Sequence, residues 1–497
     1  MMNSRHQTDG IKPYSSIALR NRFRMRLQKK GSQLGADDAT KLIRSNSEKF
    51  QYLVNAFYIY GEYPWEKSNE SRLLFSYPET DFSAGILAPF CLPDGVNRQI
   101  STCDLQSTVY DQGQIANSQF FTLYFPENKD APYLFCLRYR ANPLTVPSIC
   151  HNLTLCELLE KTNIRGMPYC DQCIAVKSKL PYHEFFEKFM KWFLKCEMVA
   201  RMMVSNELDN FLSANIISEN EFWPEQHRED LFNQLMSFLY LPVPQINESI
   251  CIDQSPYPVF NWTIPNTLKS YYPIAIRCIF DLVKNLDIKK FWQLFSALLL
   301  ERSILIYHPN QSVVCNVILA LHYLIKPLRW VFSSISQLPP SLTDILNAPN
   351  PFIIGTILDV QYIEKEWVYV DLQQKNIITG DEILIHPKKD RFCNQFYRSY
   401  NEINNSESPT LIDILESCNG IVNEMVGMLY SSIITDFSDP FNVQSKFFEE
   451  IYLQHFPTNE RHYMEVFSSS QMVMMFTEQL CRRKSDEMKQ AGSYHNQ

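Results

Sequence analysis

The chain has 497 residues, of which 45% are hydrophobic and 20% charged. This is the composition of a folded protein, and the length is too great for one ordinary hydrophobic core. The 13 glycines and 66 Phe, Tyr and Trp residues favour large packed interfaces over tight phosphate-binding loops. The net charge is −8, yet residues 1–50 carry +7, so the remainder is strongly acidic. Such a body argues against nucleic-acid binding, which needs basic surface.

The first 49 residues are basic and weakly patterned. Leu19, Phe23 and Leu27 are spaced to share one face of a short helix, which basic side chains would surround. We consider two interpretations, a solvated arm without fixed structure and a helix attracted to anionic lipid. The residues expected to contact a membrane in the second case are Arg20, Arg22, Phe23, Arg24, Arg26, Leu27, Lys29 and Lys30.

Residues 50–240 predict a first lobe of mixed α/β structure. Aromatic-rich or β-branched segments predict strands, and a helix is expected at 182–196. The expected strands are 51–61, 72–78, 120–125, 133–140 and 173–178. Six prolines within 241–273 predict a linker between two lobes, because proline blocks regular helix.

Residues 274–372 predict a second, three-layer α/β lobe. Apolar helices are expected at 288–301 and 312–326, with Ser312 as the cap of the second and Pro327 as its end. Continuous apolar runs at 351–358 and 367–372 are typical of strands in a buried parallel sheet. Residues 373–484 are expected to be helical, and residues 485–497 to form an unstructured tail.

The sequence predicts no covalent chemistry. It lacks GxxxxGK[ST], GxGxxG, HExxH and GxSxG motifs, so a P-loop enzyme, a kinase, a zincin and an α/β-hydrolase are not expected. Adjacent Glu301 and Arg302 are interpreted as a buried ion pair that fixes a turn. His308 is a lone histidine, for which a structural role is favoured over catalysis.

No targeting or metal-binding segment is expected. The chain has no run of about 18 apolar residues and its first residues lack a signal-peptide core, so we predict a cytoplasmic protein. Its 14 cysteines then favour reduced, buried thiols. The best zinc candidate is a CxxC pair with neighbouring Cys and His residues: Cys170, Cys173, Cys150, Cys156, His151 and His183. A second such pair is missing, so buried thiols are the favoured interpretation, with no metal or cofactor.

Several segments, in this order, resemble the three-part DENN module. They are PFCLPDG at 89–95, FFTLYFPENKDAPYLFCLRYR at 120–140, LFSALLLERSILIYHPNQSVVCNVILALHYLIKPLRW at 294–330, LPPSLTDILNAPNPFIIGT at 338–356, and WVYVDL at 367–372. The central stretch, with its apolar helix, Glu-Arg pair, short strand, helix and Pro-x-x-Trp, is the most specific. The resemblance covers about 50–484.

The resemblance implies a longin-like first lobe, an α/β second lobe with a helical end, and a Rab-family small GTPase bound across both. It implies guanine-nucleotide exchange in vesicle trafficking, with the protein held peripherally on membranes. The positions expected to bind the GTPase are His308, Ser312, Gln337, Leu338, Pro339, Pro349, Pro351 and Phe352. The alternatives are a folliculin-like scaffold or GTPase-activating partner, for which Arg98 is a candidate arginine, and a trafficking adaptor without exchange activity.

Overall fold

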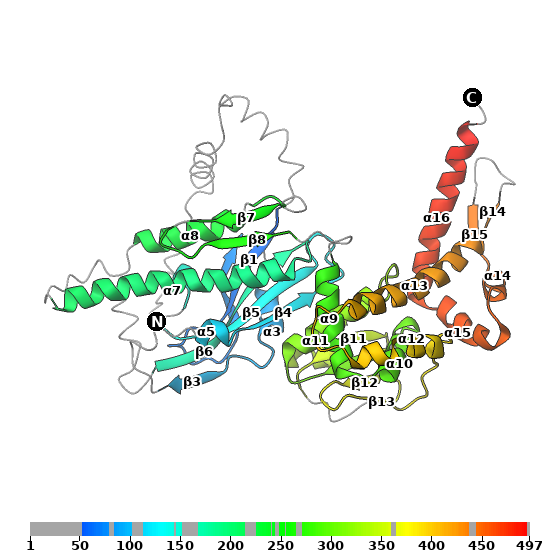
Figure 1. Ribbon diagram of the computed structural model, residues 1–497, viewed down its shortest axis with the longest axis horizontal. Helices are drawn as coiled ribbons and strands as arrows, with labels where there is room; N and C mark the ends of the chain where they lie inside the picture. Colours follow the sequence, from blue (N-terminus) through cyan, green and yellow to red (C-terminus); the bar gives the residue numbers. More distant parts are fainter. Residues whose placement is uncertain are drawn as a thin grey trace, which may run out of the picture. The chain divides into compact units, whose positions relative to one another are not determined.

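The computed structural model describes two α/β lobes (Figure 1). The described residues are 52–78, 84–101, 113–143, 146–151, 167–213, 225–239, 241–243, 248–253, 255–264, 271–358, 364–436 and 444–494. The basic arm and its expected membrane-contact residues lie outside these ranges.

An antiparallel sheet forms the centre of the first lobe. Its main path runs β2-β1-β6-β5-β4, and β3 pairs with β6. The strands are β1 (Ala56–Gly61), β2 (Arg72–Tyr77), β3 (Arg98–Ser101), β4 (Gln119–Tyr124), β5 (Tyr133–Ala141) and β6 (Met167–Ser178). The five predicted strands are confirmed. Strand β3 was not predicted, and β6 begins six residues earlier than expected.

Helix α7 (His183–Ser213) covers one face of this sheet (Figure 1). Alternate strand residues point towards it, and their aromatic rings pack against its phenylalanines. Phe186 stacks on Phe135 with ring centroids 4.3 Å apart, and Phe193 meets Phe57 edge-on at 5.4 Å. The predicted helix is therefore confirmed, but it extends well beyond Cys196.

The proline-rich segment 241–273 is more than a linker. It contains a hairpin of β7 (Ser249–Ile252) and β8 (Phe260–Thr263). Phe185 of α7 packs edge-on against Phe260 at 5.7 Å, and Trp192 Nε1 donates to Pro258 O at 2.7 Å. Together with α8 (Glu225–Leu239), this hairpin packs on α7. The linker interpretation is therefore wrong for this part, because aromatic residues between the prolines give it a packed face.

The opposite face of the first sheet has a separate, smaller core. It is covered by a 3₁₀ turn, η1 (Ala84–Leu87), and by α3 (Ala88–Cys91). Tyr58, Tyr60, Cys136 and Cys173 point into it from the strands. Two further short elements of this lobe are α5 (Gly113–Ala116) and η2 (Ser148–Cys150).

The second lobe is built on a sheet of order β10-β11-β9-β12-β13. Its first four strands are parallel, as predicted, and only the β12–β13 pair is antiparallel. The strands are β9 (Ile304–Tyr307), β10 (Ser333–Ile335), β11 (Phe352–Thr356), β12 (Val368–Asp371) and β13 (Asn376–Thr379). The mixed α/β class is therefore confirmed.

Both faces of this sheet are covered by other elements. Ile304, Ile306 and Ile353 belong to a core shared with α9 (Tyr272–Asn285), α10 (Ile288–Leu299) and α11 (Gln311–Leu324). On the other face, a small core formed by Leu305, Ile354 and their neighbours packs against the 3₁₀ helix η3 (Pro340–Asn347).

The C-terminal part is mainly helical, as expected, but it also contains strands. Its last helix continues to Tyr494, so the expectation of an unstructured tail from residue 485 is wrong up to that residue. Its helices are α12 (Lys389–Asn401), α13 (Pro409–Ser431), α14 (Glu449–Gln454), α15 (Thr458–Ser468) and α16 (Gln471–Tyr494). A hairpin of β14 (Ile433–Asp436) and β15 (Gln444–Phe447) interrupts them, so the expectation of continuous helix there is wrong. Within the described ranges, no helix has the length and apolarity needed to cross a bilayer.

Glu301 and Arg302 are not paired with each other, so the predicted ion pair is wrong. The Glu301 carboxylate accepts hydrogen bonds from Gln471 N at 2.8 Å and Met472 N at 2.5 Å. It therefore caps the N-terminus of α16, where backbone N–H groups lack helical partners. Arg302 donates instead to Glu366 O at 3.2 Å. The two charges thus tie the α10–β9 turn to different parts of the lobe.

Replacing Glu301 by alanine should destabilise the protein by about 1–3 kcal/mol, because two charge-assisted hydrogen bonds to a helix terminus are lost. Glu301 has a φ of +53°. This left-handed backbone conformation is equally strained for alanine and glutamate, but it is unstrained for glycine. Glu301→Gly should therefore destabilise by about 1 kcal/mol less. Denaturant unfolding of both variants checks this. An alanine variant as stable as the unmodified protein would contradict the capping role.

Candidate functional site

The two lobes meet where α11 packs on β4, the edge strand of the first sheet. At the start of α11, Gln119 Nε2 donates to Asn310 Oδ1 at 2.6 Å and Ser312 Oγ donates to Phe120 O at 2.8 Å. Asn310 also caps the helix, since its side chain accepts from Ser312 N at 2.9 Å. The prediction of Ser312 as the cap is therefore wrong, because its hydroxyl is used to join the lobes.

The other end of β4 is also attached to the second lobe. Tyr124 N donates to Ser336 Oγ at 3.0 Å, so a side chain takes the place of a neighbouring strand. The hydroxyls of Tyr133 and Tyr323 lie 3.0 Å apart and are hydrogen-bonded in the core. The Tyr124 ring packs edge-on against His322 at 4.9 Å. Burial lowers the pKa of His322 to about 4, so this imidazole is neutral at pH 7.

A surface cavity of about 470 Å³ lies beside this second attachment, and we call it the joint groove. The turn between β4 and β5 lines one part of it, and the segment after α11 and the loop before β11 line the rest. Its lining residues are Pro126, Glu127, Trp330, Val331, Phe332, Ser333 and Asn350. Because both lobes contribute, a partner bound here would contact both at once.

Half of the predicted GTPase-binding residues are accessible. His308 and Ser312 are half-buried near the start of α11. Pro349 is exposed and Pro351 half-buried, on either side of Asn350 in the groove. The structure therefore places these four residues near the two ends of the joint.

The other four are buried. Gln337, Leu338 and Phe352 have relative exposures of 0%, 4% and 1%, and Pro339 is also buried. Leu338 and Phe352 belong to the core beneath η3. In this structure these side chains support the surface rather than form it.

The environment of His308 fits the predicted structural role. Its Nδ1 accepts a hydrogen bond from Asn310 N at 3.0 Å, and its backbone N donates to Thr356 O at 3.3 Å. Burial lowers the pKa of His308. The neutral ring thus holds the loop that presents Asn310 to the first lobe.

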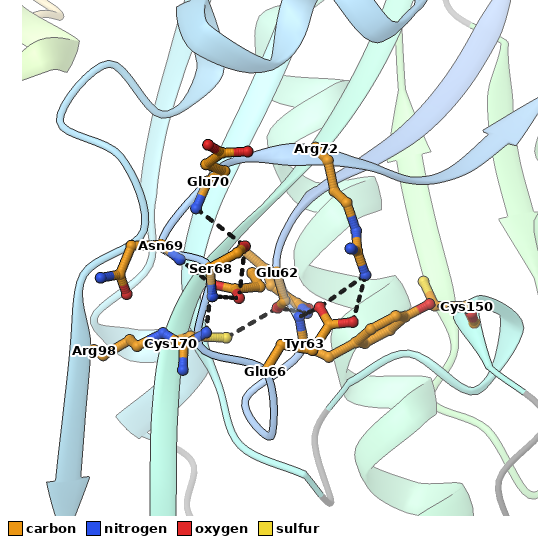
Figure 2. Close-up of polar contacts among 11 residues, drawn as sticks. Glu62, Tyr63, Glu66, Ser68, Asn69, Glu70, Arg72, Arg98, Cys150 and Cys170 are labelled. Carbon is orange, nitrogen blue, oxygen red and sulfur yellow. Dashed lines mark hydrogen bonds and ion pairs between the residues drawn. The ribbon is translucent and has the colours of Figure 1, made fainter.

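Arg98, the candidate arginine for GTP hydrolysis, is held by a buried carboxylate (Figure 2). It forms an ion pair with Glu62, and the Arg98 side chain is only 24% exposed. A catalytic arginine must reach a partner's phosphate. Arg98 would first have to leave Glu62, which has no exposed surface.

The structure separates the two cysteines of the CxxC pair, which was the best zinc candidate but not the favoured interpretation. Cys170 Sγ donates to Glu62 O at 3.0 Å (Figure 2), whereas Cys173 lies with Cys91 and Cys136. Cys156 lies outside the described residues. Most of the described cysteines are buried thiols, as predicted.

The residues that join the lobes were missed by the sequence analysis. The hydrogen-bonded pairs Gln119–Asn310, Tyr133–Tyr323 and Tyr124–Ser336 are separated by 191, 190 and 212 positions. Such pairs leave no local spacing pattern. The only signal was the number of aromatic residues, which indicated large interfaces without locating them.

Comparison with known proteins identifies the family. Residues 169–375, which include α11 and most of the second sheet, match the profile described as the DENN (AEX-3) domain. Human DENN domain-containing protein 1A is 23% identical over 253 residues, which make up 50% of this chain and 22% of that relative.

Two further relatives agree. Human DENN domain-containing protein 2C is 25% identical over 265 residues, or 47% of this chain and 28% of the relative. The DENN domain and WD repeat-containing protein SCD1 of Arabidopsis thaliana is 35% identical over 114 residues, which make up 22% of this chain and 10% of that relative. The matched region thus spans between 10% and 28% of the length of these relatives. These relatives and the profile match agree that this chain carries a DENN domain over residues 169–375.

Proposed function

We propose that this protein is a guanine-nucleotide exchange factor for a Rab-family small GTPase. The observation that carries the proposal is the DENN-domain match over 169–375, because DENN proteins generally act on Rab GTPases in this way. We further propose that the first lobe is longin-like and that the GTPase contacts both lobes. Location on membranes of the trafficking system is part of the same proposal.

Exchange requires no covalent chemistry from the protein. A surface that binds the nucleotide-free GTPase more tightly than the nucleotide-bound form must lower the affinity for nucleotide by the same factor. In the proposed arrangement the GTPase contacts both lobes, so the two lobes must keep a fixed spacing while the GTPase opens. The hydrogen bonds at both ends of β4 and the buried Tyr133–Tyr323 pair supply such a rigid connection.

The joint groove is the place we propose for part of the contact. It is open to solvent, and residues of both lobes line it. The accessible predicted residues Pro349 and Pro351 flank its Asn350. Prolines lose little conformational entropy when they are buried by a partner. This loop is therefore suited to binding without rearrangement.

The release of fluorescent mant-GDP from a panel of Rab proteins tests the proposal. We expect faster release from at least one Rab in the presence of this chain. Asn350→Arg should reduce that acceleration at least about tenfold, equivalent to about 1.4 kcal/mol of lost binding. The long side chain would fill the groove and pair with Glu127. Asn404→Arg, at an exposed loop position between α12 and α13, is the matched control and should keep full activity.

Other outcomes lead to different conclusions. Binding to a Rab without faster nucleotide release would replace exchange by scaffolding. Faster GTP hydrolysis that is lost in Arg98→Ala would show that Arg98 leaves Glu62 to act on phosphate. No binding to any Rab would overturn the proposal.

We also propose that the basic arm attaches the protein to anionic membranes. Each basic residue near such a surface contributes about 1 kcal/mol. Deleting residues 1–45 should leave exchange in solution unchanged and reduce binding to anionic liposomes, and that binding should weaken with salt. Liposome sedimentation at two salt concentrations measures this. Faster exchange in solution after the deletion would instead make the arm an inhibitory segment.

A further inference from the structure

Three cysteine thiols meet in the small core of the first lobe. Cys91 ends α3, Cys136 lies in β5 and Cys173 in β6, and their Sγ atoms all lie within 4.8 Å of one another. All three side chains are fully buried. In the β5–β6 ladder Cys136 faces Ala175 and Cys173 faces Arg138, so the two cysteines are diagonal neighbours on one face of the sheet. Three separate elements therefore supply the cluster.

The separations suit a shared cation. Zinc–thiolate bonds of 2.3 Å in tetrahedral geometry place the sulfurs about 3.8 Å apart. The Sγ atoms of Cys91 and Cys136 are 3.8 Å apart. The other two pairs are at most 4.8 Å apart, so they would have to close by about 1 Å at most. Rotation about side-chain bonds can supply a shift of that size without moving the strands.

A fourth sulfur belongs to the same core. Cys315 of α11 is fully buried and packs in the cluster that holds the three thiols. Its Sγ donates to Ser336 O at 3.7 Å, which is a weak bond that a metal could replace. The surrounding residues, including Tyr58, Tyr60 and Ala175, are mainly apolar. Such surroundings exclude water. They therefore favour a cation that prefers sulfur ligands over one that keeps its bound water.

We propose that Cys91, Cys136 and Cys173 bind a thiophilic d10 cation, Zn²⁺ or Cu⁺, and that Cys315 of the same core, which lies outside this group of three, moves in as the fourth ligand when zinc binds. Binding would displace the thiol protons and fix α3, together with the PFCLPDG segment, to the first sheet. Ligation by Cys315 would also link the site to α11 and so to the joint. This proposal does not depend on the proposed exchange activity.

Metal analysis of the full chain tests it. The protein, purified under reducing conditions, should retain about one Zn²⁺ or Cu⁺ per chain by elemental analysis and native mass spectrometry. Cys136→Ala should reduce this to background. Cys170→Ala is the matched control, because Cys170 is fully buried in the same sheet but bonded to Glu62 O, and it should retain the metal. X-ray absorption of the unmodified protein should show a sulfur-only shell, at about 2.3 Å for zinc.

The same measurements separate the two cations and can overturn the proposal. If the site is a four-sulfur zinc site, added Co²⁺ should give sulfur-to-cobalt charge-transfer absorption and tetrahedral bands. If X-ray absorption instead shows three-coordinate Cu⁺, the site consists of Cys91, Cys136 and Cys173 alone. Three results would overturn the proposal: no metal and no cobalt signal in the unmodified chain, a nitrogen or oxygen shell, or a disulfide between Cys91 and Cys136. Metal retained by a folded Cys136→Ala variant would place the metal elsewhere. None of the three measurements on the unmodified chain requires an alanine variant to fold.

Discussion

Replacing Gly355 by valine should destabilise the protein by about 3 kcal/mol, the upper end of the range typical of overpacked cores. A Cβ atom at this position would lie 2.3 Å from Val314 Cγ1 and 2.5 Å from Ser336 O. One of these neighbours is backbone and the other is a β-branched side chain, so neither can move aside easily. The φ of Gly355 is not in the left-handed region. The cost therefore comes from lack of space.

The position of Gly355 explains why such crowding should extend further. Gly355 lies in β11 beneath α11, and side chains of that helix, Val314 and Ile318, lie within 3.3 Å of where its Cβ would be. The same helix joins the first lobe through Ser312. A helix pushed away from β11 would also move at the joint, so a folded Gly355 variant should lose exchange activity along with stability.

A graded series makes this measurable. Gly355→Ala should cost less than valine, because only one carbon is added. The control is Gly420→Ala in α13, where a Cβ would have nothing within 4 Å and alanine should stabilise by up to about 1 kcal/mol through helix propensity. Denaturant unfolding followed by circular dichroism gives the differences. A Gly355→Val variant as stable as the unmodified protein would contradict the close packing of α11 on β11.

The sequence predicted elements well where one side-chain pattern dominated. The apolar runs at 351–358 and 367–372 predicted buried strands, and β11 and β12 confirm this. The aromatic-rich segments 120–125 and 133–140 predicted strands, and β4 and β5 confirm them. In contrast, β15 has the sequence QSKF, which has little strand propensity. Its pairing with β14 comes from tertiary context.

The site was harder to predict because its contacts are non-local. Asn310 and Ser312 are both good helix caps, and only Phe120, distant in sequence, determines that Ser312 joins the lobes instead. Likewise, Glu301 has an adjacent arginine, yet its partners are backbone amides 170 and 171 positions away. Residue type indicated that these positions mattered. The identity of their partners required the fold.

Glu62 should be even more sensitive to substitution than Gly355, and Glu62→Ala should destabilise by about 3–5 kcal/mol. Its side chain has no exposed surface. Oε1 accepts from Ser68 N at 2.6 Å and Ser68 Oγ at 2.9 Å, and Oε2 accepts from Asn69 N at 3.0 Å. Arg98 forms the ion pair on the same carboxylate. Alanine would leave these donors and a largely buried guanidinium without their acceptor (Figure 2).

A neighbouring ion pair provides the control. Glu66 and Arg72 also form a carboxylate–guanidinium pair in the β1–β2 turn, with contacts of 2.6 and 2.7 Å (Figure 2). Their side chains are 30% and 50% exposed, so water screens the attraction. Glu66→Gln should therefore cost less than about 1 kcal/mol. If Glu62→Gln and Glu66→Gln had equal effects, burial would not be what makes the Glu62 network important.

The pH dependence distinguishes the charge of Glu62 from its packing. Burial alone would raise the pKa of Glu62, but hydrogen bonds from Arg98 and Ser68 outweigh it and lower the pKa below the ordinary 4.5. A carboxylate with a lowered folded pKa stabilises the protein above the unfolded pKa, and this contribution is lost as pH falls through the folded value. The difference in unfolding free energy between the unmodified protein and Glu62→Gln should therefore be largest near pH 7 and shrink below about pH 4.5. A difference that stayed constant from pH 7 to pH 3 would mean that the shape of the side chain, and not its charge, holds the turn.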